Sequence, residues 1–172
     1  MPSDLELAYA AGVMDSDGYF SIGRKRGKVR ASDGVQPYYF DLKVGCNQIA
    51  NIVPRFLASI FGGAVWRCEP EGRSGGWWSW NVNSQEAGRA AEQLIPLLRL
   101  KRRQAETAVE FCVLMREDRH RVGNSFIVSP EMEERRSGLC ERMQTLNAIG
   151  GRGKLLDGVE WCEIPERQLT PA

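Results

Sequence analysis

The turn Asp15-Ser16-Asp17-Gly18 contains the residues whose types and spacing best fit catalytic chemistry. Hard cations such as Mg²⁺ bind oxygen ligands, often one or two protein carboxylates together with phosphate oxygens and water. A metal held in this turn would activate a water molecule and stabilise the leaving oxygen of a phosphodiester. The competing interpretation is that the aspartates merely end a helix, but carboxylates at a helix C-terminus oppose the helix dipole. The turn therefore predicts a metal site, although Asp-x-Asp-Gly alone is a weak pattern.

Other catalytic patterns have less support in the sequence. An EF-hand is disfavoured because its further ligands, its sixth-position glycine and its terminal glutamate are absent. Asp41-Leu42-Lys43 fits the D-x-K element of another class of metal nuclease, but its other acidic partners are not evident. A histidine-based nuclease is disfavoured because His120 is the only histidine. The five cysteines include no C-x-x-C pair, so we expect reduced thiols and no structural zinc site.

Positive charge is concentrated in the middle of the chain. The formal net charge is only +1, yet residues 18–103 carry a net +8 while the segments on either side are acidic. Basic residues cluster at 24–30 and again at 99–103. A protein that binds a polyanion with one face needs such an asymmetry. The distribution therefore predicts a nucleic-acid partner.

The elements that must position these residues begin with a helix from Ser3 or Asp4 to about Met14. Small residues let two helix backbones approach closely, and one stripe of this helix is almost wholly small. We therefore expect a helix–helix contact along that stripe. It consists of Ala8, Ala11, Gly12 and Asp15.

The remaining patterns predict an α+β fold of the order αββαββα, with one antiparallel four-stranded sheet and helices on one of its faces. The chain forms a single domain over 1–172, with a core at about 4–118 and a C-terminal helix and basic loop at about 130–155. Alternating apolar and polar residues predict the strands, and longer apolar spacings predict the helices. We expect strands at 19–23, 38–44, 64–69 and 77–82, and further helices at 48–61, 84–99, 102–117 and 130–149. Pro54 would either bend the helix at 48–61 or place its true start later.

Two segments of the chain resemble a known family. Residues 10–18, followed by Tyr19-Phe20-Ser21-Ile22, resemble the LAGLIDADG motif of homing endonucleases, with Ala10 in place of the first leucine. Residues 96–105 are similar to a segment of the single-motif homodimeric enzymes of algal chloroplasts, and residues 146–154 resemble their C-terminal segment more loosely. The resemblance covers roughly residues 5–155. No sequence repeat is visible, so the acidic motif occurs once per chain.

The resemblance implies an active site shared by two subunits. Asp17 would bind the metal with its carboxylate, Ser16 would bind it with its backbone carbonyl, and Lys101 would stabilise developing negative charge. The family places a polar residue after the second strand to order the attacking water. An ungapped alignment puts Cys46 at that position, and a slip of one or two residues puts Asn47 or Gln48 there. The expected cofactor is Mg²⁺, with Mn²⁺ and Ca²⁺ as other occupants, and the expected dimer interface is the stripe Ala8, Ala11, Gly12 and Asp15.

The outward face of the sheet is expected to bind double-stranded DNA, because a β-ribbon fits the major groove. The tryptophans of the third and fourth strands are expected to pack in the core or at the sheet edge. In the fourth strand, Trp78, Trp80 and Val82 would point inward. Alternation places ten residues on the outward face, namely Ser21, Gly23, Lys25, Tyr39, Asp41, Lys43, Arg67, Glu69, Ser79 and Asn81. Phosphates or outer base pairs would be contacted by the loop residues Arg24, Arg26, Lys28 and Arg30 and by the C-terminal Arg152 and Lys154.

The implied function is a sequence-specific endonuclease that cleaves a long pseudo-palindromic DNA site as a homodimer and leaves short 3′ overhangs. An RNA-splicing maturase and a non-cleaving DNA-binding protein of the same fold are the alternatives. No apolar run approaches the roughly 20 residues that a membrane span needs. The N-terminus lacks the layout of a signal peptide, so we expect an intracellular protein, in an organelle or in a bacterial or phage-infected cytoplasm.

Overall fold

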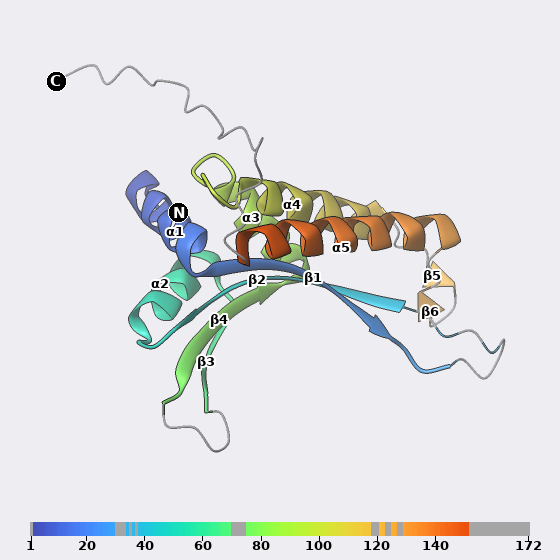
Figure 1. The fold of residues 1–172 in the computed structure, drawn as a ribbon, viewed down its shortest axis with the longest axis horizontal. Coiled ribbons are helices and arrows are strands. Elements are labelled where there is room, and N and C mark those ends of the chain that lie inside the picture. Colours follow the sequence, from blue (N-terminus) through green and yellow to red (C-terminus); the bar gives the residue numbers. More distant parts are fainter. Residues whose placement is uncertain are drawn as a thin grey trace.

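The computed structural model describes residues 2–29, 34, 36, 38–69, 75–117, 121–122, 125–126 and 129–151. Helices and strands follow one another in the order expected from the sequence, with a short additional hairpin before the last helix (Figure 1). The elements are α1 (Asp4–Ser16), β1 (Gly18–Arg26), β2 (Tyr38–Gln48), α2 (Ile52–Phe61), β3 (Ala64–Cys68), β4 (Trp77–Asn83), α3 (Ser84–Leu94), α4 (Arg102–Glu117), β5 (Arg121–Val122), β6 (Ser125–Phe126) and α5 (Pro130–Gly151).

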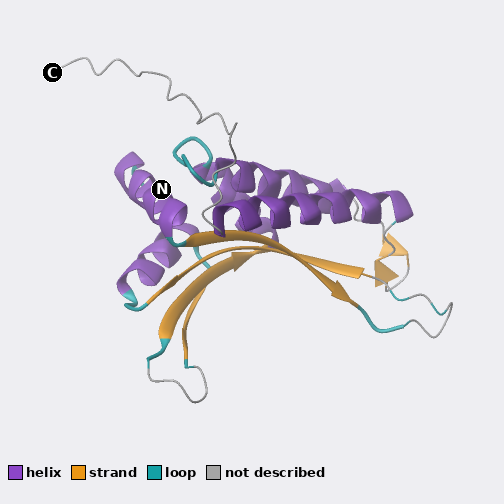
Figure 2. Ribbon diagram, viewed as in Figure 1, coloured by secondary structure: helices purple, strands orange, loops and turns teal. Residues whose placement is uncertain are grey.

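One curved antiparallel sheet forms the centre of the fold, with the strand order β1-β2-β4-β3. Figure 2 shows that α3, α4 and α5 cover the convex face of the sheet, while α1 and α2 lie together at one end of it. No helix of the described residues covers the concave face. The predicted α+β class, the four-stranded sheet and the placement of helices on one face are thus confirmed.

Helix α1 begins where local chemistry requires it to begin. The Ser3 hydroxyl accepts a hydrogen bond from the Glu6 backbone N–H, and the Glu6 carboxylate accepts one from the Ser3 backbone N–H. This reciprocal capping box satisfies two N–H groups that a helix N-terminus leaves without partners. The helix continues to Ser16, two residues beyond the predicted end, and Gly18 starts strand β1. A side chain on Gly18 would collide with Met14, so a glycine is required at this junction.

The second strand extends further than its alternating pattern predicts. Strand β2 runs to Gln48, and helix α2 begins at Ile52 rather than at Gln48. Pro54 therefore lies in the first turn of α2, where its missing N–H costs no hydrogen bond. The longer strand places Gln48 in the sheet, beside the end of α1.

Two helix boundaries on the convex side also differ from the prediction. Helix α3 ends at Leu94 rather than at Arg99, and a turn with irregular backbone follows it up to Lys101. Helix α5 ends at Gly151 rather than at Ile149. Hydrogen bonds to the Asp15 side chain draw the α3–α4 turn back towards the end of α1.

The core lies between the convex face of the sheet and the three helices over it. Strand residues Phe20, Leu42 and Val44 are almost fully buried, as are Leu94 of α3 and Phe111 of α4. Buried apolar area contributes about 25 cal/mol per Å², so this layer is the main source of stability.

Trp80 and Trp78 are inward, as predicted. Trp80 is completely buried, and its indole N–H donates a hydrogen bond to the Gly62 carbonyl at 2.8 Å. This hydrogen bond satisfies the indole N–H, which is the only polar group of the buried side chain.

Within the described residues, none of the helices combines the length and the apolar character that crossing a membrane requires.

Candidate active site

Asp17 lies at the junction of α1 and β1, at the edge of the sheet. Its backbone N–H still donates to the Val13 carbonyl at 2.9 Å, so the helix holds its position. Its carboxylate is exposed and accepts a hydrogen bond from the Gln48 side-chain amide at 2.7 Å and one from the Ser16 hydroxyl at 3.3 Å. Strand pairing explains the first contact, because Gly18 lies opposite Cys46 and the end of β2 therefore reaches Asp17.

Three neighbouring residues of β2 were candidates for the third active-site position, and the structure separates them. The side chain of Gln48 contacts Asp17 directly. Cys46 is completely buried, and this burial, with a smaller contribution from the Asp17 charge, raises the pKa of its thiol to about 11. Asn47 faces the opposite side of the sheet, since it pairs with Ser79. Only Gln48 combines a polar side chain with contact to Asp17.

Asp15 binds its own chain and is not available to a metal in this arrangement. Its two carboxylate oxygens accept hydrogen bonds from the backbone N–H groups of Arg99 at 2.8 Å, Leu100 at 3.1 Å and Lys101 at 2.9 Å. These N–H groups precede helix α4, whose first N–H groups have no partners within the helix. A side chain of α1 therefore holds the turn that leads into α4, more than eighty residues away in the sequence.

The side chain of Lys101 forms a second set of hydrogen bonds, between the turn before α4 and the junction of α1 and β1. Its ammonium donates hydrogen bonds to the backbone carbonyls of Met14 at 3.0 Å, Ser16 at 3.1 Å and Gly18 at 2.7 Å. A cation there satisfies carbonyls that a helix C-terminus leaves without partners and complements the helix dipole. Burial lowers the pKa of Lys101 below its ordinary value, and the nearby carboxylates of Asp15 and Asp17 oppose that shift. We refer to the six hydrogen bonds made by Asp15 and Lys101 as the Asp15–Lys101 clasp.

The donor set at the end of α1 fits a hard cation. Asp17 offers a carboxylate, Ser16 a backbone carbonyl and Gln48 an amide oxygen, and Mg²⁺ prefers oxygen ligands. Among the described residues, no cluster of three or more His, Cys, Asp or Glu side chains could hold a metal by itself. One carboxylate is enough where phosphate oxygens and water complete the coordination, as is common for Mg²⁺.

The strand register confirms the predicted face for eight of the ten outward residues. Side chains that lie opposite each other in neighbouring strands share a face. The pairs Ser21–Lys43, Gly23–Asp41 and Lys25–Tyr39 place six of these residues on the concave face. Asn81 pairs with Gly45 and Ser79 with Asn47 on the same face, although Ser79 is only 4% exposed.

The prediction is wrong for Arg67 and Glu69. Arg67 pairs with Trp78, and the next pair on that face is Val65 with the buried Trp80, so Arg67 faces the convex side. Strand β3 ends at Cys68, and Glu69 forms an ion pair with Arg67 at 3.0 Å. The concave face instead receives Trp66, which pairs with Ser79 and is 39% exposed. The strand alternates as expected, but with the opposite phase.

Two of the four basic residues expected in the hairpin loop lie in strand β1 instead. Arg24 and Arg26 belong to β1 and pair with Phe40 and Tyr38, on the convex side of the sheet. The Arg24 guanidinium lies 3.7 Å from the centre of the Tyr38 ring, which is a cation–π contact. Lys28 follows the strand and is exposed. The predicted contacts of Arg30, Arg152 and Lys154 lie outside the described residues.

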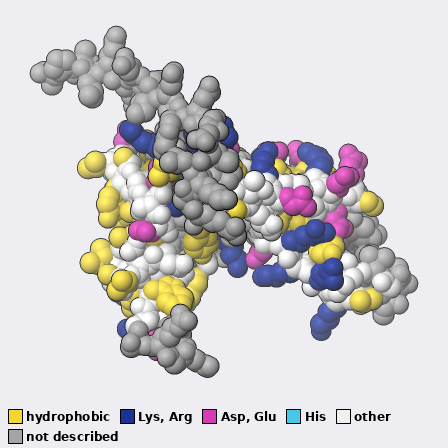
Figure 3. Space-filling view, in the orientation of Figure 1, with side chains coloured by type: hydrophobic (Ala, Val, Ile, Leu, Met, Phe, Trp, Pro, Cys, Tyr) yellow, Lys and Arg dark blue, Asp and Glu magenta, His cyan; other side chains and the backbone are white. Residues whose placement is uncertain are grey.

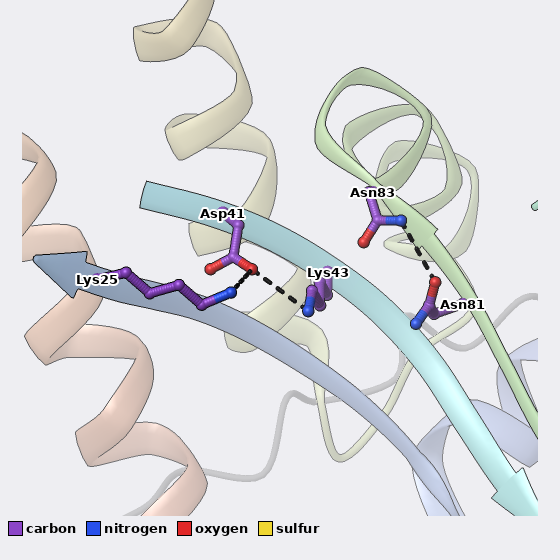
Figure 4. Close-up of polar contacts among 5 residues, drawn as sticks. All are labelled: Lys25, Asp41, Lys43, Asn81 and Asn83. Atoms are coloured by element: carbon purple, nitrogen blue, oxygen red, sulfur yellow. Dashed lines mark hydrogen bonds and ion pairs between the residues drawn. The ribbon is translucent and has the colours of Figure 1, made fainter. Parts of the chain in front are cut away.

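An ionic cluster occupies the concave face between β1 and β2 (Figure 4). One oxygen of Asp41 lies 3.3 Å from the ammonium of Lys25 and 3.3 Å from that of Lys43. Partial burial raises the pKa of Asp41, but the hydrogen bonds and charges of both lysines outweigh it and bring the pKa below its ordinary value. The other oxygen lies over Gly23, where any side chain would collide with it. Gly23 thus makes room for Asp41, and the cluster keeps a net positive charge.

Tyr19 is a residue of the concave face that sequence reasoning missed. A Cβ atom at Gly45 would lie 2.5 Å from the Tyr19 hydroxyl oxygen, so the ring lies across β2 at a glycine. Burial raises the pKa of the Tyr19 phenol, while hydrogen bonds with Asn81 and Ser79 act in the opposite sense. The ring therefore reaches from β1 to β4, directly beside the Asp17 turn. The sequence signal was a tyrosine that lies opposite a glycine in the neighbouring strand. This signal could be used only once the register of β1 and β2 was known.

Helix α1 leaves one of its faces uncovered. Leu5 is 81% and Tyr9 53% exposed, and Ala8 and Gly12 are exposed on the same helix. Figure 3 shows hydrophobic side chains gathered at this end of the molecule, over α1 and α2. The predicted interface is wrong for Ala11, which is 1% exposed because it packs into the core of its own chain.

Comparisons with known proteins support the fold. A scan of protein-family models and a search of curated proteins found no match to the sequence. Among solved structures, the homing endonuclease I-CvuI in complex with its target has a TM-score of 0.62 at 19% identity, covering 83% of this chain and 82% of that chain. The archaeal intron-encoded homing endonuclease I-Vdi141I complexed with DNA has a TM-score of 0.63 at 15% identity, covering 83% and 84%. The LAGLIDADG homing endonuclease I-SmaMI bound to cleaved DNA has a TM-score of 0.57 at 18% identity, covering 80% of this chain and 43% of that chain. The chain therefore has the fold of the LAGLIDADG homing endonucleases.

Proposed function

We propose that this protein is a sequence-specific double-strand DNA endonuclease. It would cleave a long pseudo-palindromic site as a homodimer, by metal-dependent hydrolysis that leaves short 3′ overhangs. The observation that carries the proposal is the exposed Asp17 carboxylate, held by Gln48 where α1 meets β1 at the edge of the sheet. The solved structures with this fold include I-CvuI with a DNA target in the presence of Ca or Mg. This supports double-stranded DNA as the partner and a divalent metal as the cofactor.

The residues at the end of α1 have distinct parts in this proposal. Asp17 and the Ser16 carbonyl would hold Mg²⁺. The bound ion would lower the pKa of water and stabilise the charge on the leaving oxygen. Gln48 can both donate and accept hydrogen bonds, so it would orient the attacking water beside Asp17. The Lys101 ammonium would stabilise the negative charge that develops on the phosphate.

DNA would lie against the concave face of the sheet. The strands present Lys25 and Lys43 there, and a β-ribbon of this kind fits the major groove. Asp41 fixes both ammonium groups relative to each other, so they meet the DNA as a positioned pair. Phosphate neutralisation by such groups makes affinity fall with rising salt. We therefore expect steep salt dependence of duplex binding.

The number of available carboxylates supports a homodimer. Of the two aspartates in the turn, one chain supplies only Asp17, because Asp15 is engaged in the clasp, and cutting both DNA strands requires two such sites. The uncovered face of α1 lies on the same helix and offers small residues for close contact. The coverage agrees with a half-site unit, since the chain matches 82% of I-CvuI but only 43% of I-SmaMI.

Substituting Gly12 tests the dimer without damaging the monomer. A Cβ atom at Gly12 meets nothing within 4 Å, so Gly12→Leu fits the isolated chain and removes a flexible residue from the helix. In a close α1–α1 contact the added side chains would collide. We expect dimer affinity in sedimentation to fall about 100-fold or more, since overpacking costs roughly 1–3 kcal/mol at each site.

The matched control is Gly138→Leu in α5, where an added Cβ also meets nothing within 4 Å. This variant should dimerise like the wild type. A Gly12→Leu protein that remains a dimer and still cleaves would contradict the α1 interface.

Paired substitutions in β2 test the third active-site position. Gln48→Ala removes the side chain that contacts Asp17, and we expect cleavage to slow by roughly 10²-fold or more with DNA binding retained. Cys46→Ala should leave the cleavage rate close to that of the wild type, because the buried thiol stays protonated at neutral pH. Single-turnover cleavage rates compare the two. Loss of activity in Cys46→Ala alone, with an intact fold, would return the role to Cys46.

The function itself is tested by cleavage of a library of pseudo-palindromic duplexes, with Mg²⁺ and with EDTA. We expect a defined subset of duplexes to be cut in both strands only with Mg²⁺, and sequencing of the ends gives the overhang. Binding without cleavage would indicate the non-cleaving DNA-binding alternative. Neither binding nor cleavage, together with promotion of intron splicing, would indicate a maturase.

A further inference from the structure

The Lys101 ammonium is already bound at the place where the proposed metal ligands lie. All three of its N–H donors point to backbone carbonyls at the junction of α1 and β1, at 2.7–3.1 Å. An ammonium group has no further donors. One of the three acceptors is the Ser16 carbonyl, which is also the proposed backbone ligand of the metal. The same oxygen therefore has two candidate cations.

We infer that Lys101 is a resident cation of this site and opposes metal binding until DNA is present. The inference rests on the proposed function, because it concerns the same Asp17 site. A divalent ion on the Ser16 carbonyl would face an ammonium held 3.1 Å from that oxygen, and two cations so close repel each other. Partial burial of Lys101 weakens screening by solvent and strengthens the repulsion.

The clasp explains why Lys101 does not simply swing away. The backbone N–H of Lys101 donates to Asp15, so the start of its side chain is fixed relative to α1. The ammonium can leave only if it finds other acceptors for three hydrogen bonds. A DNA phosphate beside Asp17 provides such acceptors and adds oxygen ligands for the metal. Release of Lys101 and binding of the metal are therefore both favoured by the same phosphate, which limits metal-dependent chemistry to the DNA complex.

The test measures Mn²⁺ binding to the protein without DNA, by isothermal titration calorimetry. Lys101→Met removes the charge, and we expect Mn²⁺ to bind at least about tenfold more tightly, which corresponds to ~1.4 kcal/mol. Lys101→Gln also removes the charge but keeps two N–H donors for the carbonyls, so it covers the case in which Lys101→Met fails to fold. Arg103→Gln removes one exposed positive charge two residues away and should leave Mn²⁺ affinity unchanged.

Asp17→Asn separates failure of the inference from failure of the proposed site. We expect this variant to lose the Mn²⁺ site. If Asp17→Asn combined with Lys101→Gln binds Mn²⁺ as tightly as Lys101→Gln alone, the proposed metal site is wrong. If Asp17→Asn loses binding while Lys101→Gln binds no more tightly than the wild type, the metal site stands and the inference about Lys101 is overturned. An equal gain in Arg103→Gln would also overturn it, because the effect would then be one of net charge.

Discussion

Asp17→Asn is expected to abolish cleavage while the protein still binds its duplex. Asparagine has nearly the shape of aspartate but lacks the negative charge that a divalent ion requires. Removing the metal's charge stabilisation costs several kcal/mol, so the cleavage rate should fall at least about a thousand-fold, or ~4 kcal/mol. DNA binding should persist or tighten, because a negative charge beside the phosphate is lost. Gel-based cleavage and a fluorescence binding titration measure the two properties on the same duplex.

Asp41→Asn is the matched control for this variant, since it also neutralises one aspartate, on the concave face rather than at the α1 end. It should change duplex affinity or site preference and leave the chemical step in place. An Asp17→Asn protein that cuts as well as the wild type would show that the proposed site is wrong. Loss of the chemical step in Asp41→Asn alone would instead support a D-x-K nuclease.

Asp15→Ala is expected to be among the most destabilising substitutions of an incompletely buried residue in this chain. The change removes an acceptor for three backbone N–H groups and separates the α3–α4 turn from the end of α1. Hydrogen bonds to a charged group contribute roughly 1.5–3 kcal/mol each but are not additive. We expect a loss of about 2–3 kcal/mol in the free energy of unfolding, and about 5–10 °C in Tm for a domain of this size. Urea and thermal denaturation measure both.

The control for Asp15→Ala is Glu92→Ala, which removes an exposed carboxylate from helix α3. That variant should stay within about 0.5 kcal/mol of the wild type, as most surface substitutions do. Equal stabilities of the Asp15 and Glu92 variants would mean that the clasp contributes nothing to folding.

Most of the fold could be predicted from local sequence patterns, because each pattern of apolar and polar residues lies within a single helix or strand. Period-two alternation in β1, β2 and β4 identified the buried residues Phe20, Leu42 and Trp80 correctly. Strand β3 was assigned the wrong face, since a five-residue strand that follows two glycines gives no internal evidence of its phase. The helix predicted from Gln48 began too early, because a proline in a first turn looks the same in sequence as a proline inside a helix.

The candidate site was harder to predict, because its contacts join segments far apart in the chain. The motif led to the proposal of Asp17, and the register that favours Gln48 over Cys46 came only from the pairing of β1 with β2. Sequence spacing could not show that the two aspartates of one turn have different partners. Nor could it show that the Lys101 ammonium binds carbonyls, since backbone acceptors leave no signature in residue types.

The junction of α1 and β1 has a geometric consequence for the products of the reaction. The uncovered face of α1 at Gly12 and the Asp17 carboxylate belong to one rigid segment, separated by little more than one helical turn. In the proposed dimer, the depth to which the two helices interlock would therefore set the distance between the two scissile bonds. The packing of helix α1 would therefore determine the stagger of the cut ends, independently of the base sequence that the sheet contacts.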